Sequence, residues 1–227
     1  MKGGTTCDGG AGPTVNVSLA AQRPAGIRRG EILRKLLHIS PGLLAFLLPL
    51  LPHEKPLPPQ GLFEVTLITS ILTAIYIAAR RIVARPGETD FYVTTLSYPI
   101  AVLATLFAFP GAPELAVIVV VVIAFGDGSA YLGGKCIGGP RLPWNADKTW
   151  AGTLSFLAVA GPLASLAYFG EAGSETPWLV AVACGCGAAF FSAIAESLPT
   201  RLSDNLRVGV TAAVAASAIH FVVLPPL

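Results

Sequence analysis

Charged side chains are scarce in this sequence. They make up 12% of the 227 residues, whereas hydrophobic residues make up 53%. A water-soluble domain of this length needs a more polar surface, so the composition excludes an ordinary soluble enzyme. Apolar runs long enough to cross about 30 Å of hydrocarbon recur along the chain. We therefore predict an all-α protein, a polytopic bundle of membrane-spanning helices.

Two further features are missing. The four cysteines, at positions 7, 136, 184 and 186, have no metal-binding spacing, so a metal site built on cysteine is not expected. The N-terminus lacks the apolar segment of a cleavable signal peptide. Residues 1–30 are rich in Gly, Ala, Pro and Thr without apolar periodicity. We interpret them as a flexible cytoplasmic tail, and residues 31–227 as a transmembrane catalytic domain.

The distribution of basic residues predicts how the chain is oriented. Seven spans are expected near residues 33–52, 62–79, 92–109, 114–133, 150–169, 178–196 and 207–224. With the N-terminus in the cytoplasm, fourteen of the fifteen Lys and Arg residues lie on the cytoplasmic side, and only Lys55 lies in an opposite loop. Because Lys and Arg in short loops set orientation, the C-terminus is predicted outside. We expect a bacterial inner membrane, with the active site facing the cytoplasm.

An acidic residue within the fourth span is the first sign of chemistry. Asp127 lies about 20 Å inward from Glu114 at 1.5 Å per helical residue, which places it in the inner third of the bilayer. An isolated carboxylate is costly there, so Asp127 is expected to face a cavity, a partner or a metal. The alternative is a helix-packing patch in which Asp127 is bonded to a neighbouring arginine.

A glycine-rich segment follows this span. It runs from Gly133 and Gly138 through Asn145 to Lys148 and Thr149, ahead of a predicted helix. Backbone amides, a helix N-terminus and a lysine are groups that bind polyphosphate. We interpret the segment as a cytoplasmic nucleotide-binding loop, although its spacing is not that of a Walker A loop. The alternative is a positively charged loop with turn glycines.

More polar residues are predicted at the same membrane face. Glu196 ends the sixth span, and Asp204 with Asn205 precedes the seventh. Together with Asp127 and Lys148, they would place carboxylates and a cation around one site.

The start of the first span adds basic residues. Glu31, Arg34, Lys35 and His38 have helical spacing, so that Arg34 and His38 share a face and Glu31 can pair with Lys35. Basic residues that flank a first span are also ordinary topology signals, and a histidine at an interface is more often structural than catalytic.

The opposite membrane face carries few ionisable residues. His53 and His220 lie there and are assigned no chemistry. Glu64 and Glu114 are expected near the outer interface, where they can reach water.

Together these motifs resemble the phytol kinase and dolichol kinase family. The resemblance covers about residues 28–210 and rests, in chain order, on Arg34-Lys35-x-x-His38, Gly126-Asp127-Gly128 with Ala130, Gly133 and Gly138, Asn145, Lys148-Thr149 before Gly152, Glu196-Ser197-Leu198-Pro199, and Asp204-Asn205. Members of this family are polytopic enzymes that use CTP or a related nucleotide to phosphorylate isoprenoid or other lipid alcohols.

The resemblance implies a transferase of lipid metabolism, a CTP-dependent kinase for an alcohol such as phytol, geranylgeraniol or a polyprenol, with Mg²⁺ as cofactor. The implied catalytic residues are Asp127, Lys148, His38, Glu196 and Asp204. The implied nucleotide-binding residues are Arg34, Lys35, Gly133, Gly138, Asn145, Lys148, Thr149 and Asn205. The implied metal ligands are Asp127, Glu196 and Asp204. Besides the nucleotide and the alcohol, membrane lipids are the expected partners and nucleic acid is not.

Two alternatives remain open at this point. Phosphatidate cytidylyltransferase, the CDP-diacylglycerol synthase, also resembles the stretches Asp127-Gly128-Ser129-Ala130-Tyr131 and Lys148-Thr149-Trp150-x-Gly152, but its later Lys-Arg, Lys-Asp and His-Gly-Gly signature is absent after Glu196. A non-enzymatic transporter or lipid-binding membrane protein would explain Asp127 but not the polyphosphate-like loop.

Overall fold

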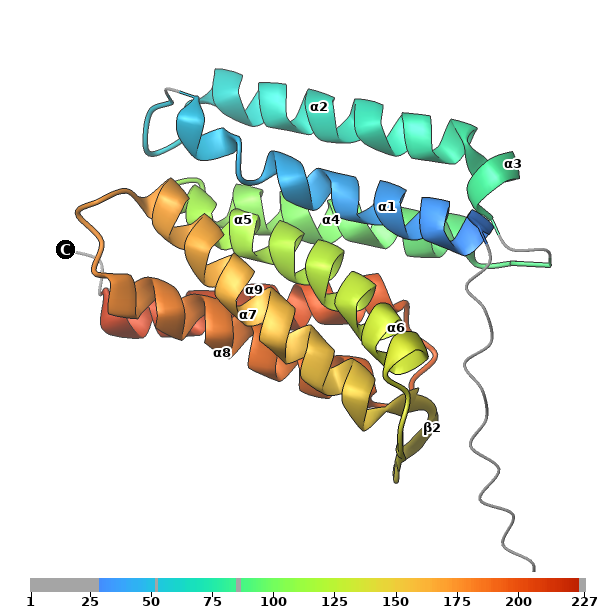
Figure 1. Ribbon diagram of the computed structural model, residues 1–227. Helices are drawn as coiled ribbons and strands as arrows, with labels where there is room; N and C mark the ends of the chain where they lie inside the picture. Colours follow the sequence, from blue (N-terminus) through green and yellow to red (C-terminus); the bar gives the residue numbers. More distant parts are fainter. Residues whose placement is uncertain (1–28, 52, 85–86, 225–227) are drawn as a thin grey trace, which may run out of the picture.

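Long apolar helices form almost the whole molecule (Figure 1). The computed structural model describes residues 29–51, 53–84 and 87–224, with side chains from Leu33 onward. Within these ranges seven segments are long and apolar enough to span a membrane: Leu33–Leu50, Pro59–Ala78, Phe91–Ala108, Pro113–Cys136, Trp150–Ala172, Trp178–Ser197 and Asp204–Val223. The predicted all-α, seven-span architecture is confirmed, and each predicted end lies within three residues of the observed one. The predicted tail falls outside the described residues, except for Arg29 and Gly30, which begin the first helix.

The elements follow the chain in a simple order. They are α1 (Arg29–Leu44), the 3₁₀ helix η1 (Leu48–Leu50), α2 (Pro59–Ala78), α3 (Arg80–Val83), α4 (Phe91–Ala108), α5 (Pro113–Val121), the π-helical turn η2 (Val122–Gly126), α6 (Asp127–Cys136), β1 (Arg141–Leu142), β2 (Asn145–Thr149), α7 (Trp150–Ala172), α8 (Trp178–Ser197) and α9 (Asp204–Val223). α5, η2 and α6 together make the fourth span.

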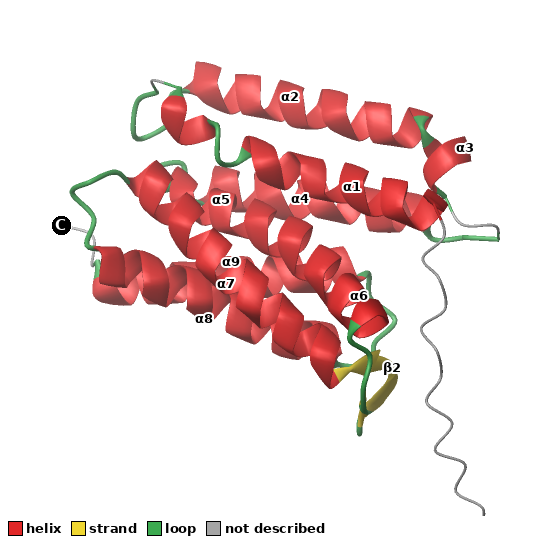
Figure 2. Ribbon diagram, in the orientation of Figure 1, coloured by secondary structure: helices red, strands yellow, loops and turns green. Residues whose placement is uncertain are grey.

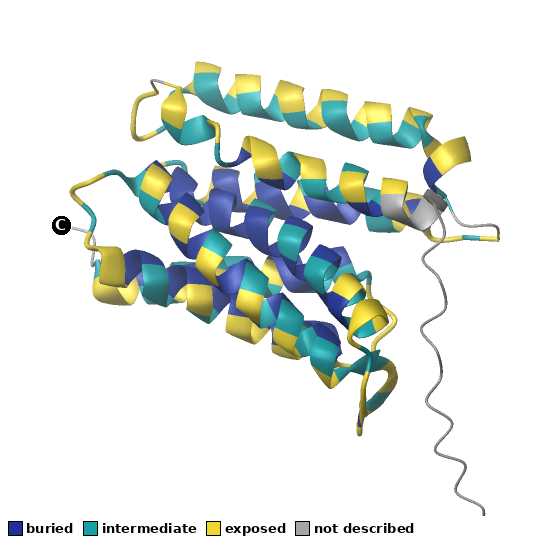
Figure 3. Cartoon of the chain, in the orientation of Figure 1, coloured by how far each residue is buried: buried dark blue, intermediate teal, exposed yellow. Residues whose placement is uncertain are grey.

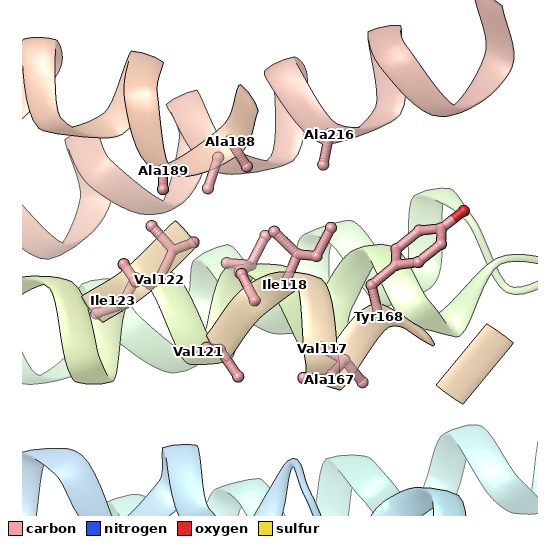
Figure 4. Close-up of a cluster of buried hydrophobic side chains, with 14 of the residues drawn as sticks. Val117, Ile118, Val121, Val122, Ile123, Ala167, Tyr168, Ala188, Ala189 and Ala216 are labelled. Atoms are coloured by element: carbon pink, nitrogen blue, oxygen red, sulfur yellow. The ribbon is translucent and has the colours of Figure 1, made fainter. Parts of the chain in front are cut away.

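The core is centred on α5, which packs against α4, α7 and α9. Branched side chains such as Val117 and Ile118 meet alanines of the neighbouring helices, as Figure 4 shows. Small residues allow membrane helices to approach closely, since lipid provides no hydrophobic drive for their association. At Gly185 of α8, an added Cβ would lie 2.6 Å from the Cα of Ser165 in α7. The α7–α8 contact therefore requires glycine at this position.

α2 lies outside this core. Of its residues, all of which the structure describes, none is buried, and Figure 3 shows only exposed and intermediate positions along it. It packs mainly on α4. At the C-terminal end of α2 the ring of Tyr76 stacks on Phe91, with centroids 6.0 Å apart, and the Arg80 guanidinium lies 5.0 Å from the centre of the Tyr92 ring. These contacts attach the end of α2 to the start of α4.

A short hairpin projects beyond the helices (Figure 2). β1 and β2 pair antiparallel, and Leu142 is buried, which anchors the hairpin. The predicted glycine-rich loop begins later than expected, because Gly133 and Lys135 still belong to α6. A Cβ at Gly133 would lie 3.0 Å from the carbonyl oxygen of Ala151 in α7. The glycines of this stretch serve close packing of α6 on α7, which stabilises a helix that glycine alone would disfavour.

Chemical labelling tests the orientation of the bundle. In a cysteine-free background, we expect Asp147→Cys and Leu202→Cys to react with a membrane-impermeant maleimide from one side of sealed vesicles, and Glu175→Cys from the other side. The reason is that the loops after α6 and α8 meet at one end of the bundle, while the loop after α7 lies at the other. Labelling of all three positions from the same side would contradict the seven-span topology.

Candidate active site

The π-helical turn η2 directs Asp127 into a cavity. A π turn adds one residue to a helical turn and is frequent at functional sites. α6 begins directly afterwards with Asp127, whose side chain is 24% exposed. The cavity measures about 2030 Å³. Asp127 is therefore a membrane-embedded carboxylate that faces an open space, as predicted.

Two basic residues of α1 meet this carboxylate. Lys35 Nζ lies 2.5 Å from Asp127 Oδ2, and His38 Nε2 lies 3.6 Å from the same oxygen. Lys35 is 9% exposed, so the ion pair is nearly buried. Its ammonium also lies 5.0 Å from the centre of the Tyr131 ring. Lys35 thus has a partner 92 residues away in the sequence. The predicted pairing of Lys35 with Glu31 involves a side chain outside the described part.

The histidine is held between aromatic and polar neighbours. The ring of His38 lies 5.3 Å from that of Tyr98, and the Tyr98 hydroxyl donates to the Val120 carbonyl at 3.0 Å. Among the described residues, His38 Nε2 has no hydrogen-bond partner. It is a buried ring nitrogen beside Asp127, in a position to exchange a proton with a bound group.

A second ionic cluster gathers at the start of α7. Lys148, at the end of β2, donates to Glu196 of α8 and lies 3.2 Å from Asp204 Oδ2 of α9. Glu196 is 2% exposed, so the lysine neutralises a buried carboxylate. Lys148 and Asp127 also line the same cavity. The two clusters are therefore neighbours.

Burial and charge act in opposite directions on Lys148. Burial disfavours the charged ammonium, but the carboxylates of Glu196 and Asp204 outweigh this effect and raise the pKa of Lys148 above its ordinary value. Lys148 is thus positively charged throughout the neutral pH range.

Arg207 stabilises the second cluster, that of Lys148, Glu196 and Asp204, and the sequence analysis did not predict this role. Its Nη2 lies 2.6 Å from Asp204 Oδ1, and its Nη1 donates to the Leu198 carbonyl at 2.8 Å and to the hydroxyl of Thr200. It therefore joins the start of α9 to the loop after α8. Its spacing of three residues from Asp204 was the one signal in the sequence.

One cavity unites the principal predicted residues. It is lined, among others, by Arg34, Lys35, His38, Asp127, Gly138, Lys148, Thr149, Glu196, Asp204 and Asn205. Arg34 lies 4.0 Å from Glu88, a partner that the sequence analysis did not identify.

Four of the predicted nucleotide-binding residues make structural contacts. Of the described residues, Gly133 and Asn145 are not among those that line the cavity. Gly133 packs on α7, and Asn145 donates to the Ser197 carbonyl at 3.0 Å. Thr149 caps α7 by accepting from the Gly152 amide at 3.1 Å. Asn205 donates to the Thr94 carbonyl at 2.9 Å. The last two residues also line the cavity.

The acidic residues fit a metal that is shared with another ligand. Asp127, Glu196 and Asp204 offer the oxygen donors that Mg²⁺ takes. Within the described residues no three of the His, Cys, Asp and Glu side chains converge as a metal cluster. Mg²⁺ commonly uses one or two carboxylates together with phosphates and water. The arrangement therefore suits Mg²⁺ held jointly with a nucleotide, rather than a cage made by the protein alone.

A separate ionic cluster lies at the opposite end of the bundle. His53 Nε2 is 2.6 Å from Glu171 Oε1, and Lys55 Nζ is 3.4 Å from Glu114 Oε2 and 3.7 Å from Glu171 Oε1. Glu114 and Glu171 are 7% and 5% exposed, so the expectation that Glu114 reaches water is wrong. The loop between α1 and α2 supplies the cation that makes this burial possible.

We expect Lys55→Met to lower the free energy of unfolding by about 3–5 kcal/mol, because it leaves the buried carboxylate of Glu114 without its cation and that of Glu171 with His53 alone. Thermal unfolding in detergent measures the effect. The triple variant Lys55→Met/Glu114→Gln/Glu171→Gln should recover part of the loss, since it also removes the stranded charges. An unchanged unfolding temperature in Lys55→Met would show that the carboxylates do not depend on the lysine.

Comparison with curated proteins identifies three relatives. The chain is 27% identical to a farnesol kinase of Arabidopsis thaliana over 216 residues, 84% of this chain and 66% of the relative. It is 27% identical to a probable phytol kinase of Oryza sativa subsp. japonica over 237 aligned positions, 93% of this chain and 75% of the relative. A probable phytol kinase of Glycine max is 35% identical over 100 residues, 41% of this chain and 31% of the relative. All three are named as chloroplastic. The resemblance predicted from the motifs is confirmed.

Two other comparisons gave no match. No protein-family model matches the chain, and no solved structure is significantly similar to it.

Proposed function

We propose that this relative of the phytol and polyprenol kinases transfers the γ-phosphoryl group of CTP, or of a related nucleoside triphosphate, to the hydroxyl group of an isoprenoid alcohol. The observation that carries the proposal is the meeting of two lysine–carboxylate clusters, around Asp127 and Lys148, in one cavity. The kinase names of the relatives support it.

The lysines would bind the triphosphate. Phosphoryl transfer requires positioning and stabilisation of charge on the phosphate oxygens, which lysine supplies as a point charge. Lys148, on β2, and Lys35, on α1, both line the cavity. Both lysines are now paired with carboxylates, and phosphate oxygens would replace some of these contacts.

The transfer itself is a single displacement. The alcohol oxygen forms a bond to the γ-phosphorus while the bond from that phosphorus to the β–γ bridging oxygen breaks, and CDP leaves. The hydroxyl proton must pass to a base. His38 Nε2, which has no hydrogen-bond partner among the described residues, or a carboxylate of Asp127 beside it, would accept this proton.

Mg²⁺ would be held by Asp127, with Glu196 or Asp204, and when bound it would neutralise charge across the phosphates. The protein contributes the orientation of these carboxylates: η2 directs Asp127, and Arg207 holds Asp204 at 2.6 Å. Glu196 is fixed by burial.

The site would face the cytoplasm, because fourteen of the fifteen Lys and Arg residues, all except Lys55, are expected on its side of the membrane. A location in a bacterial inner membrane stays a prediction. The names of the two relatives place those proteins in the chloroplast.

Two labels on one nucleotide test the proposal. The purified protein is incubated with Mg²⁺ and either γ-labelled or α-labelled CTP, in the presence of farnesol, phytol, geranylgeraniol, diacylglycerol or phosphatidate. We expect γ-label in a prenyl monophosphate and no α-label in any lipid. Transfer of α-label to phosphatidate would instead identify a cytidylyltransferase. Competition by unlabelled ATP, GTP and UTP then ranks the donors.

A further inference from the structure

The cavity extends far beyond the polar site. Its volume of about 2030 Å³ exceeds the range of roughly 300–1,000 Å³ that is usual for a small-molecule pocket. Its lining residues continue from Lys35 and Asp127 to Leu51 and Glu171 at the opposite end of the bundle. The polar site is therefore the cytoplasmic end of a longer channel.

One face of α2 forms a wall of this channel. The α2 residues that line the cavity recur at helical spacing. They are Gly61, Glu64, Val65, Ile68, Thr69, Leu72, Thr73, Ile75 and Tyr76, and Ala79 continues the row just after the helix. From Gly61 to Ala79 this wall is about 27 Å long at 1.5 Å per residue. The hydroxyl of Thr73 donates to the Thr69 carbonyl of its own helix at 2.7 Å. Apart from Glu64 at the end remote from the polar site and the hydroxyl groups of Thr69, Thr73 and Tyr76, the wall is apolar, and it is nearly as long as the hydrocarbon core is thick.

Apolar side chains of other helices form the remaining walls. They include Leu44 and Leu48 of the first span, Val102 and Leu106 of α4, and Val117 of α5. Since no residue of the fully described α2 is buried, its contacts with α4 leave part of its inward face open.

The channel is bounded at both ends. At the cytoplasmic end it opens on the ionic pair of Lys35 and Asp127. At the other end His53 and Glu171, which are paired at 2.6 Å, belong to its lining. An apolar chain that reached this pair would meet charged groups and lose the benefit of burial.

We propose that the channel between α2 and the helices α1, α4 and α5 binds the hydrocarbon tail of the alcohol, and that its depth, with the His53–Glu171 pair as its end, limits the length of tail accepted. The proposal rests on the proposed function and adds the site of the tail. The occupant follows from continuity: the tail of an alcohol whose hydroxyl lies beside Asp127 can continue along the apolar part of the same cavity. A membrane lipid that merely fills the space is the competing occupant.

Tryptophan substitutions along α2 provide a graded test. Leu72, Thr69 and Val65 lie about 6, 10 and 16 Å from Tyr76 along the helix axis. We expect each tryptophan to set an upper limit on the length of tail that is accepted. The limit should be shortest in Leu72→Trp, intermediate in Thr69→Trp and longest in Val65→Trp. For each variant, kcat/KM should stay near the wild-type value for alcohols shorter than the block and fall about tenfold or more for longer ones, as measured with 10-, 15- and 20-carbon prenols.

The matched controls are Leu67→Trp and Ile71→Trp. These positions are on the same helix, are 47% and 50% exposed, and are not among the described residues that line the cavity. They should leave the preference for tail length unchanged. If the inward and outward variants alter all three alcohols equally, the tail does not lie along α2.

A binding measurement separates this proposal from the proposed kinase activity. A prenol that carries a diazirine at its tail end is photolysed with the wild-type protein, and the labelled peptides are identified. Label in α1, α2 or α4, competed by an excess of unmodified prenol, supports the channel even if no phosphate is transferred. Phosphorylation of prenols with the label confined elsewhere would overturn the channel and leave the kinase intact. Label that phospholipid competes away as well as prenol does would identify the occupant as a membrane lipid.

Discussion

Asp127→Asn is expected to reduce phosphoryl transfer at least about 10³-fold, because it keeps the shape of the side chain and removes the charge from the centre of the site. Transfer of γ-label from CTP to geranylgeraniol under saturating conditions measures the loss. The substitution also leaves Lys35, only 9% exposed, without its carboxylate, so a decrease in stability of about 3–5 kcal/mol accompanies it.

A double variant separates these two effects. Asp127→Asn/Lys35→Met removes both charges, so its unfolding temperature in detergent should return toward the wild-type value while transfer stays absent. If Asp127→Asn alone keeps substantial activity, Asp127 is a partner of Lys35 and no part of the chemistry.

Lys148→Ala is expected to lower kcat by about 10²–10³, by analogy with the loss of one donor to a developing charge in a water-poor site. Lys148→Arg should recover only part of this rate, because a planar guanidinium does not replace a compact ammonium between Glu196 and Asp204.

The pH dependence of Lys148 follows from its raised pKa. Because this pKa lies above the ordinary value of 10.5, Lys148 stays protonated up to at least that pH. Its contribution to stability is therefore present at neutral pH and is lost only as the pH rises above that range, so we expect no activity change between pH 6 and 9 from this group.

Arg81→Ala is the matched control for Lys148→Ala. It removes one cation from the same membrane face, but Arg81 is exposed and is not among the described residues that line the cavity. Both variants should insert with unchanged topology, because the other basic residues keep the bias. Near-normal turnover of a correctly inserted Lys148→Ala would show that the lysine is a topology signal.

The spans were predictable because each is a continuous apolar run, and a run of that length has one stable arrangement in a bilayer. The helical structure around Gly133 was not predictable, because the local sequence treats glycine as a residue that ends helices. Here the missing Cβ of Gly133 lets α6 approach Ala151 of α7. The hairpin of β1 and β2 was missed for a related reason. Its strands are too short to show a period of two, and the burial of Leu142 that anchors it is a tertiary contact.

The types of residue at the site were predictable, but their pairing was not. Intramembrane charge identified Asp127, and position at one membrane face identified Lys148 and Glu196. That Lys35 pairs with Asp127 depends on how α1 crosses η2, which no local spacing encodes. The burial of Glu114 was missed in the same way, because its cation arrives on a loop 59 residues away.

The turn at Val122–Gly126 makes the site sensitive to length as well as to composition. Each residue of an α-helix rotates the chain by about 100°, so the single additional residue of a π turn fixes the direction of everything beyond it relative to everything before it. Losing one apolar residue from this segment would keep every motif letter and yet rotate the carboxylate of Asp127 away from Lys35 while α5 stayed in the core. Two chains can therefore share the full set of motifs and differ in whether those residues ever meet, and the count of apolar residues before the Gly-Asp-Gly sequence is itself part of the motif.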